Sequence, residues 1–301
     1  MVLSPLLFSG SSNLNLANKI AQLLNLSLGK RDIHFFPDKE IFVEILEPVQ
    51  ARDIFVIQSL FNDPNIHLME LLIMVDALKR AGAESITAVL PYFGYARQDR
   101  LIRSGMSITA KLVADLLTCS GITKIITLDL HSDQIEGFFD IPVEHLTSRS
   151  LLANYCTNFN LAEAVIVAPD KGGIKIASEF SRELNLPMAM IDKERLDPYN
   201  VEMRFFIGNV ANKTVILTDD MCSTAGTLIN AAKTCHALGA NKIFALVGHA
   251  LFVKNALVHL EESVIEKIIT TDSVSSSSEI KNHSKIHVLS VASLFSKAMS
   301  N

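Results

Sequence analysis

The chain contains no tryptophan and only four tyrosines, four cysteines and nine prolines among its 301 residues. The cysteines form no CxxC pair and have no metal-ligand spacing with histidines, so neither a disulfide framework nor a zinc site is predicted. No apolar run approaches the roughly 18 to 20 residues of a membrane span, so no membrane association is expected. The net charge of −5 argues against a broad nucleic-acid surface, which needs clustered lysine and arginine. The first ten residues have no basic leader, so they predict a first strand in a cytoplasmic protein, not a signal peptide.

Hydrophobic residues make up 49% of the chain, enough for the cores of one large or two ordinary domains. Apolar runs typical of buried strands alternate with segments of helical periodicity. This alternation predicts an α/β protein with mainly parallel sheets flanked by helices. The pattern restarts near residues 142–150, so we expect two similar domains, 1–146 and 147–286.

Several element boundaries are expected from capping and breaking residues. Asn13 and the two serines before it are positioned to cap a helix that Gly29 ends. The serine run at 275–278 predicts a flexible connection between two late strands. A last helix is expected from residue 292 to residue 300.

The stretch TVILTDDMCSTAGT, residues 214–227, carries the strongest chemical signal. Residues 214–217 predict a buried strand and residues 228–239 predict a helix, with a loop of acids, hydroxyls and one glycine between them. Such a loop presents backbone N–H groups and a helix dipole to a phosphate, and the residues suited to that task are Ser223, Thr224, Gly226 and Thr227. Asp219 and Asp220 would repel a phosphate, so they are expected to face sugar hydroxyls or a Mg²⁺ ion. The alternative is an ordinary helix cap with two solvated aspartates.

Charged and glycine-containing loops follow other predicted strands as well. They contain Arg97, Gln98, Asp99 and Arg100 after one strand, His131 after the next, and Asp170, Lys171, Gly172 and Gly173 in the second half. Arginines, a lysine and paired glycines at a sheet edge favour anion binding, and Asp170 is a candidate Mg²⁺ ligand. Lys193 and Arg195 belong to a charged segment after another predicted strand. The tract 194–204 lacks an apolar period and predicts a mobile loop or an exposed hairpin. Solvated loops, a tight turn and a hydrogen-bonded histidine are the alternatives.

Taken in order, the motifs FFPDKE, YARQDR, DLHSDQIEGFF, APDKGG, IDKER and DDMCSTAGT resemble those of ribose-phosphate pyrophosphokinases, which have the phosphoribosyltransferase fold. The resemblance covers nearly the whole chain. It implies two phosphoribosyltransferase-type domains, with the segment from about 287 to 301 packing on the first. It also implies self-association into a dimer or a larger assembly such as a hexamer, because the FFPDKE loop completes the neighbouring subunit's ATP site in this family.

The resemblance assigns a role to each motif. The implied ATP-binding residues are Phe36, Asp38, Glu40, Arg97, Gln98, Asp99, Arg100 and His131, and the implied metal-binding residues are His131 and Asp170. Ribose 5-phosphate would be held by Asp219, Asp220 and the loop Ser223, Thr224, Ala225, Gly226 and Thr227. Asp170, Lys171, Gly172 and Gly173 resemble the pyrophosphate loop, and Lys193 and Arg195 match the catalytic flexible loop.

The implied reaction is attack of the C1 hydroxyl of ribose 5-phosphate on the β-phosphorus of Mg-ATP, giving 5-phospho-α-D-ribose 1-diphosphate and AMP. Two alternatives are a catalytically inert regulatory homologue and a true phosphoribosyltransferase. Ser223 stands where the best-known family members have aspartate. We therefore expect catalysis without a carboxylate at this position.

Overall fold

The computed structural model describes residues 4–159, 161–195 and 201–300, while the side chains of 193–204 are not among those described. The chain divides into two compact units. Unit 1 comprises Met1–Thr147, Ser273–Ser275 and Ser290–Asn301, and unit 2 comprises Ser148–Asp272 and Ser276–Leu289. No helix in the described residues is long and apolar enough to cross a membrane.

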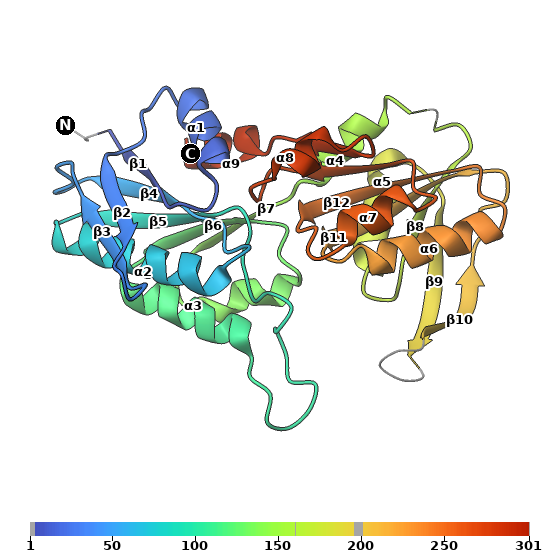
Figure 1. Cartoon of the computed structure of the whole chain (residues 1–301), viewed down its shortest axis with the longest axis horizontal. Helices are drawn as coiled ribbons and strands as arrows, with labels where there is room; N and C mark the ends of the chain where they lie inside the picture. The colour runs from blue at the N-terminus through green and yellow to red at the C-terminus, as the bar shows by residue number, and fades with distance from the viewer. Residues whose placement is uncertain (1–3, 160, 196–200, 301) are drawn as a thin grey trace. The chain divides into compact units, whose positions relative to one another are not determined.

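Unit 1 is built on a five-stranded parallel sheet in the order β1-β4-β5-β6-β7 (Figure 1). The strands are β1 (Leu6–Ser9), β4 (Asp53–Ile57), β5 (Ser85–Leu90), β6 (Lys124–Leu128) and β7 (Val143–Leu146). Helices α1 (Leu14–Leu23) and α9 (Ala292–Met299) cover one face, and α2 (Pro64–Arg80) and α3 (Thr109–Ser120) cover the other (Figure 1). A short 3-10 helix, η1 (Asp133–Phe138), follows β6.

The core of unit 1 follows from alternation along its strands. Ile54 and Val56 of β4 join the buried cluster beneath α2 and α3, whereas the intervening β4 residues belong to the opposite pleat. Helix α2 contributes Leu71, Met74 and Val75 at helical spacing. These contacts hold the sheet in place. Because its strands are parallel, the polar segments that follow them lie at one edge of the sheet.

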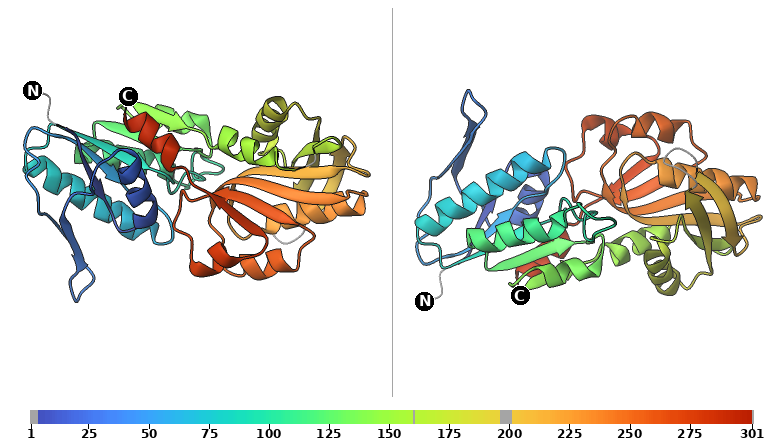
Figure 2. Two further views of the ribbon diagram at one scale, coloured as in Figure 1. Left: turned by 90° about the horizontal axis from the view of Figure 1, so that it is seen from above. Right: turned by 90° about the horizontal axis from the view of Figure 1, so that it is seen from below.

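Strands β2 (Arg31–Phe35) and β3 (Ile41–Ile45) form a separate antiparallel hairpin in unit 1. The hairpin lies along α2 through β3 and its turn projects away from the five-stranded sheet (Figure 2). His34 and Phe42 stack with ring centroids 4.6 Å apart, and Phe36 meets both rings edge-on. These aromatic contacts hold the two strands together close to the turn.

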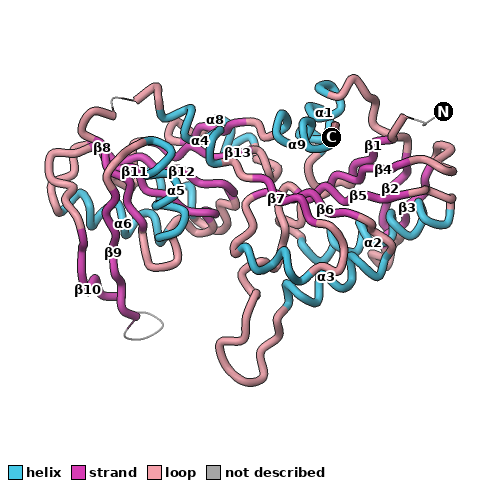
Figure 3. Tube along the Cα trace, turned by 180° about the vertical axis from the view of Figure 1, so that it is seen from behind, coloured by secondary structure: helices cyan, strands magenta, loops and turns pink. Residues whose placement is uncertain are grey.

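Unit 2 contains a seven-stranded sheet in the order β10-β9-β8-β11-β12-β13-β14, parallel except for β10. Its strands are β8 (Ala164–Ala168), β9 (Met188–Arg195), β10 (Val201–Ile207), β11 (Thr214–Cys222), β12 (Lys242–Ala250), β13 (Lys267–Thr271) and β14 (Ile286–Leu289). Its helices are α4 (Arg149–Cys156), α5 (Ile174–Leu184), α6 (Gly226–Ala237), α7 (Ala256–Glu261) and α8 (Ser278–Asn282). Figure 3 shows β9 and β10 together at one edge of this sheet. The described residues of the 194–204 tract therefore lie in two strands that pair antiparallel, as the hairpin prediction requires and the mobile-loop prediction does not.

Two buried clusters form on the two faces of this sheet because its strand residues alternate in direction. Val215 and Leu217 of β11 pack with α6 and α7, while Ile216 packs on the other face with α4 and α5. Both sheets are thus mainly parallel and flanked by helices. This confirms the predicted α/β class.

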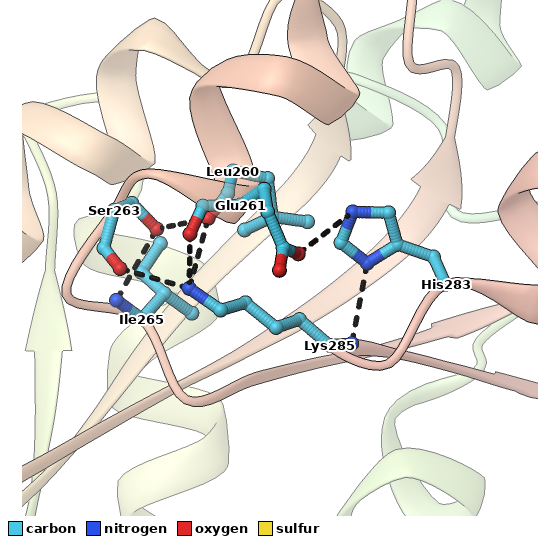
Figure 4. Close-up of polar contacts among 6 residues, drawn as sticks. All are labelled: Leu260, Glu261, Ser263, Ile265, His283 and Lys285. Atoms are coloured by element: carbon cyan, nitrogen blue, oxygen red, sulfur yellow. Dashed lines mark hydrogen bonds and ion pairs between the residues drawn. The ribbon is translucent and has the colours of Figure 1, made fainter.

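The C-terminal end of α7 is held by one lysine of unit 2 (Figure 4). Lys285 Nζ donates to the carbonyls of Leu260, Glu261 and Ser263 at 3.2, 2.7 and 2.9 Å. Helix-terminal carbonyls lack intrahelical donors, and a cation there also complements the helix dipole. Lys285 therefore connects α7 to the segment that enters β14.

One expected helix boundary is wrong. Helix α1 ends at Leu23 and not at Gly29, because Asn25, which follows the C-cap residue Leu24, adopts the left-handed φ of 53° and the N–H of Leu26 bonds the carbonyl of Ala21. Gly29 instead allows the chain to pass over Phe8, whose ring lies 2.5 Å from where a Cβ would be.

The serine run at 275–278 is not simply a flexible connection. Ser277 caps helix α8 by accepting from the N–H of Ile280 at 3.3 Å, and Ile280 is buried. A capping serine followed three residues later by a core isoleucine gives the segment both a start signal and an anchor.

Candidate active site

Strand β11 extends further than the sequence predicted. It runs to Cys222, because β12 is long enough to pair Asp219 with Val247 and Cys222 with Ala250. The two acids therefore belong to the strand, and the connection to α6 consists of residues 223–225 only. The prediction that Asp219 and Asp220 lie in the loop is wrong.

The short β11–α6 loop delivers its backbone directly to the start of α6. Ala225 adopts φ 63° at the N-cap, and Gly226 and Thr227 form the first turn. Backbone N–H groups of a first helical turn have no intrahelical acceptor. Ser223 is half-buried and Thr224 and Thr227 are exposed, so hydroxyls surround these donors.

The segment that follows β12 supports the loop from behind. Leu251 and Phe252 donate their N–H groups to the carbonyl of Cys222, and Val253 donates to the carbonyl of Ser223 at 2.9 Å. The loop's carbonyl groups are thereby used inside the fold. The N–H groups of the loop and of the first turn of α6 are the donors that an anion site would use.

Three carboxylates lie together at this edge of unit 2. Asp220 is 9% exposed, and Asp219 accepts its N–H at 3.0 Å. Burial raises the pKa of Asp219 well above its ordinary value, and the charges of Asp220 and Asp170 raise it further. The site therefore favours hydrogen-bond donors or a cation next to these acids.

The loop between β8 and α5 brings Asp170 and Lys171 to the same edge. Asp170 Oδ1 accepts from the N–H groups of Gly172 and Gly173 at 2.9 and 3.2 Å. A Cβ on Gly172 would lie 3.2 Å from that same oxygen, so a larger residue would disturb the turn. Lys171 Nζ lies 3.1 Å from Asp192 Oδ1 on β9. Asp192 was not among the predicted residues, although it directly precedes Lys193 in the IDKER motif.

In unit 1, the loop after β5 begins with a close backbone approach. A Cβ on Gly94 would lie 2.6 Å from the carbonyl oxygen of Leu60. Gln98 Oε1 accepts from Thr109 Oγ1 at 2.7 Å, which ties the loop to the start of α3. Arg97 and Arg100 are exposed.

The loop after β5 also contacts the turn that carries His131. Asp99 Oδ2 accepts from Ser132 Oγ at 2.7 Å and from Gln134 Nε2 at 3.2 Å. His131 itself is exposed between β6 and η1. The structure therefore places predicted residues of two motifs, Asp99 and His131, in neighbouring loops of one unit.

The turn of the β2–β3 hairpin contains Phe36, Asp38 and Glu40, all exposed. Asp38 Oδ1 accepts from the N–H of Glu40 at 3.2 Å, and Lys39 has φ 73°. The turn is internally hydrogen-bonded and presents Phe36 outward, with 44% of its surface exposed.

The backbones of Lys193 and Arg195 belong to β9, but their side chains lie outside the described residues. Among the described residues, no group of three or more histidines, cysteines, aspartates or glutamates is arranged to hold a metal ion alone. A hard cation that takes only one or two carboxylates and fills its remaining positions with phosphate oxygens and water, as Mg²⁺ does, does not need such a group.

These features define a class of protein. Parallel sheets whose strands lead into a hydroxyl-rich helix N-terminus, buried acids and a paired-glycine loop are typical of enzymes acting on phosphorylated sugars in the phosphoribosyltransferase fold. Comparison with known proteins narrows this class. Residues 5–121 match the family model for the N-terminal domain of ribose phosphate pyrophosphokinase, and residues 197–301 match that for the phosphoribosyl synthetase-associated domain.

Relatives that match over nearly the whole chain point to the same family. A ribose-phosphate pyrophosphokinase of Fusobacterium nucleatum is 46% identical over 295 residues, which are 97% of this chain and 93% of that protein. Another from Bacillus caldolyticus is 45% identical over the same shares. The crystal structure of phosphoribosylpyrophosphate synthetase from Mycobacterium smegmatis matches with a TM-score of 0.93 and 36% identity, covering 99% of this chain and 98% of that one.

The chain belongs to the ribose-phosphate pyrophosphokinase family. The family, the enzyme class and the two-domain fold predicted from the motifs are thus confirmed. The comparisons support neither the inert homologue nor the phosphoribosyltransferase.

Proposed function

We propose that this enzyme transfers the β,γ-diphosphoryl group of ATP to the C1 hydroxyl of ribose 5-phosphate, giving 5-phospho-α-D-ribose 1-diphosphate and AMP for nucleotide synthesis. The observation that carries the proposal is the end of β11. There, the half-buried Asp219 and the buried Asp220 lie near the end of the strand, two residues before a hydroxyl-rich loop at the N-terminus of α6. A sugar with a phosphate at one end would bind both the acids, through its hydroxyls, and the hydroxyl-rich loop, through its phosphate.

Ribose 5-phosphate would bind with its phosphate on the first turn of α6. The N–H groups of that turn and the hydroxyls of Ser223, Thr224 and Thr227 are donors, and no basic residue is needed in the loop itself. Asp219 and Asp220 would accept from the ribose hydroxyls. Such donors stabilise a carboxylate whose pKa is raised by burial and by neighbouring charge.

The ATP-binding residues are proposed from the family motifs and the loops described above. Arg97 and Arg100 are exposed cations that suit phosphate oxygens, and Gln98, Asp99 and His131 lie in the same two connected loops. The outward-facing turn with Phe36, Asp38 and Glu40 suits an adenine or a neighbouring subunit. We therefore include self-association, as a dimer or larger assembly, in the proposal.

Asp170, Lys171 and the two glycines after them are proposed to hold the pyrophosphate. Lys171 supplies charge, and the paired glycines leave the backbone open to a ligand. Lys193 and Arg195 are proposed as the catalytic cations that neutralise charge on the transferring group. In-line attack needs positioning above all, which the β8–α5 and β11–α6 loops would provide.

The acids of unit 2 fit a Mg²⁺ ion. Asp219 lies beside two further carboxylates that raise its pKa, and a cation relieves that repulsion. In unit 2 the residue proposed to bind Mg²⁺ is Asp170. In unit 1 His131 is proposed to contact Mg²⁺ through water, because hard cations prefer oxygen. When bound, Mg²⁺ would neutralise phosphate charge and orient the phosphates. A cytoplasmic location is also proposed. The proposed domains are 1–146 and 147–286, with the segment from about 287 to 301 joining the first domain.

Calorimetric titration with ribose 5-phosphate and with ribose tests the sugar-phosphate site. Ribose 5-phosphate should bind and ribose should not, and Thr227→Val should weaken binding about tenfold, the effect of one lost hydrogen bond to a charged group. Thr234→Val is the matched control, since Thr234 lies on the same helix and bonds only the carbonyl of Asn230. Equal binding of ribose and ribose 5-phosphate would contradict a phosphate site at α6.

A further inference from the structure

The turn that carries His131 begins with an unfavourable backbone conformation. Asp129 directly follows β6 and adopts φ 40°, a left-handed conformation that residues with a side chain rarely adopt. Its N–H donates to the carbonyl of Leu146 on the neighbouring strand β7 at 3.0 Å. Such a conformation persists only where surrounding contacts determine it, so the contacts on the next residues matter.

One of these contacts comes from a histidine on β7. His145 Nε2 accepts the N–H of Leu130, the residue before His131, at 2.9 Å. Because a backbone N–H can only donate, Nε2 must carry the lone pair and Nδ1 the proton. Nδ1 accordingly donates to Glu136 Oε1 of η1 at 2.7 Å. His145 therefore contacts Leu130 within the turn and Glu136 in η1 just after it, and its side chain is only 19% exposed.

A second contact comes from the loop after β5. Asp99 accepts from Ser132 and Gln134, which lie on the far side of His131. Hydrogen bonds to a carboxylate are stronger than those between neutral groups. The residues on both sides of His131 are thus fixed by side chains of two other elements, β7 and the β5–α3 loop, while His131 stays exposed.

We propose that His145 and Asp99 are positioning residues that hold the strained 129–134 turn and thereby aim His131 at the nucleotide. The inference rests on the proposed function, in which His131 contacts ATP. It assigns a role to His145, which lies outside every motif that the sequence singled out. It also gives Asp99 a contact within the protein in addition to its predicted place in the ATP site.

Two substitutions of His145 distinguish the contact made by Nε2 from the contact made by Nδ1. His145→Gln places an amide oxygen at the same number of bonds from Cα as Nε2, so it keeps an acceptor for Leu130. His145→Asn reaches only as far as Nδ1, so it keeps a donor for Glu136 and loses the acceptor. Glu144→Gln is the control, because Glu144 is adjacent on β7 and pairs with Lys124 on β6, away from the 129–134 turn.

Two readouts are measured on each full-length variant. Hydrogen–deuterium exchange of the peptide covering 129–136 should be unchanged in His145→Gln and Glu144→Gln and faster in His145→Asn. The KM for ATP should rise about tenfold in His145→Asn and stay within about twofold in the other two, with the KM for ribose 5-phosphate unchanged in all, since one hydrogen bond is lost at one site. A general loss of structure would instead change both KM values and the melting temperature.

The outcomes decide between positioning and a merely structural contact. Unchanged exchange and ATP KM in a folded His145→Asn variant would overturn the proposal, and so would equal damage in His145→Gln and His145→Asn. If the wild-type protein formed no AMP, the proposed function would fail, and the exchange data would still decide whether His145 holds the turn.

Ser132→Ala tests the second contact without altering Asp99, which is itself predicted to bind ATP. It should also raise the KM for ATP and leave that for ribose 5-phosphate unchanged. Because both contacts hold one turn, the effect of the Ser132→Ala/His145→Asn pair should be smaller than the product of the single effects. An effect equal to that product would show that the contacts act on independent structures and would overturn the shared role.

Discussion

Asp219 lies on β11 near the carboxylates of Asp220 and Asp170, and its pKa is raised by burial and by both charges. The carboxyl group of Asp219 therefore holds its proton more tightly in the folded protein than in the unfolded chain. Linkage then requires that the free energy of unfolding falls as pH rises from the ordinary aspartate pKa of about 3.9 through the raised folded value. The ionised carboxylate of Asp219 therefore lowers the free energy of unfolding at neutral pH, while its oxygens serve as hydrogen-bond acceptors at the site.

Asp219→Asn should remove this cost. The variant should melt a few degrees above wild type at pH 8, since about 1 kcal/mol shifts the melting temperature of a protein by about 2–4 °C at 150–250 residues. Its advantage should shrink as pH falls toward 4. AMP formation should drop at the same time, because an amide is a poorer acceptor for ribose hydroxyls. Calorimetry at pH 5 and 8 checks the sign, and a variant less stable than wild type at pH 8 would contradict it.

Ser223 poses a different question at the residue scale. Its hydroxyl is half-buried in the loop before α6, and its carbonyl is held by Val253. A carboxylate here would add negative charge beside the phosphate and beside Asp219. Ser223→Asp should therefore leave turnover unchanged or lower it, as steady-state kinetics would show. A rise by orders of magnitude would mean that a carboxylate base is required.

At the scale of the element, helix ends and close approaches position the loops. Lys285→Met should lower the free energy of unfolding by about 1–2 kcal/mol, because three terminal carbonyls of α7 and its following turn lose a charged donor. Denaturant unfolding measures this. Lys281→Met, on the exposed side of α8, is the control and should have little effect; equal stability of both variants would show that the carbonyl contacts contribute nothing.

Gly94→Ala should damage the loop that carries Arg97. An alanine Cβ would lie 2.6 Å from the carbonyl oxygen of Leu60, so the backbone must move. We expect a lower melting temperature and a higher KM for ATP. Gly137→Ala is the control, because a Cβ there meets no atom within 4 Å. A Gly94→Ala variant with wild-type stability and kinetics would refute this account of the loop.

Most elements were predictable, because apolar runs and helical periodicity are local signals. The misjudged boundaries depend on tertiary contacts or on cap geometry. Strand β11 extends through Asp219 because β12 offers partners as far as Ala250, which no local pattern shows. Asn25, not Gly29, ends α1, because asparagine also tolerates the left-handed conformation. The contact between Lys171 and Asp192 joins different strand–loop–helix segments and has no sequence periodicity.

At the scale of the whole molecule, both units follow one plan. Each has a mainly parallel sheet with helices on both faces, and each presents polar loops where its strands end. In unit 1 these loops carry arginines and a histidine, and in unit 2 they carry acids, hydroxyls and glycines. The division suits a reaction with two substrates, a polyphosphate and a sugar phosphate. The roles of single residues were predictable only through the family motifs, since a lone charged loop is as often just solvated.

The most direct test of the central claim is phosphorus NMR of the purified protein with Mg-ATP and ribose 5-phosphate, alongside Lys193→Ala. We predict that AMP and 5-phospho-α-D-ribose 1-diphosphate appear together in equal amounts with wild type, and that both fail to appear with the variant. Intact ATP in the presence of bound nucleotide, or release of inorganic phosphate in place of the ribose diphosphate, would contradict the account.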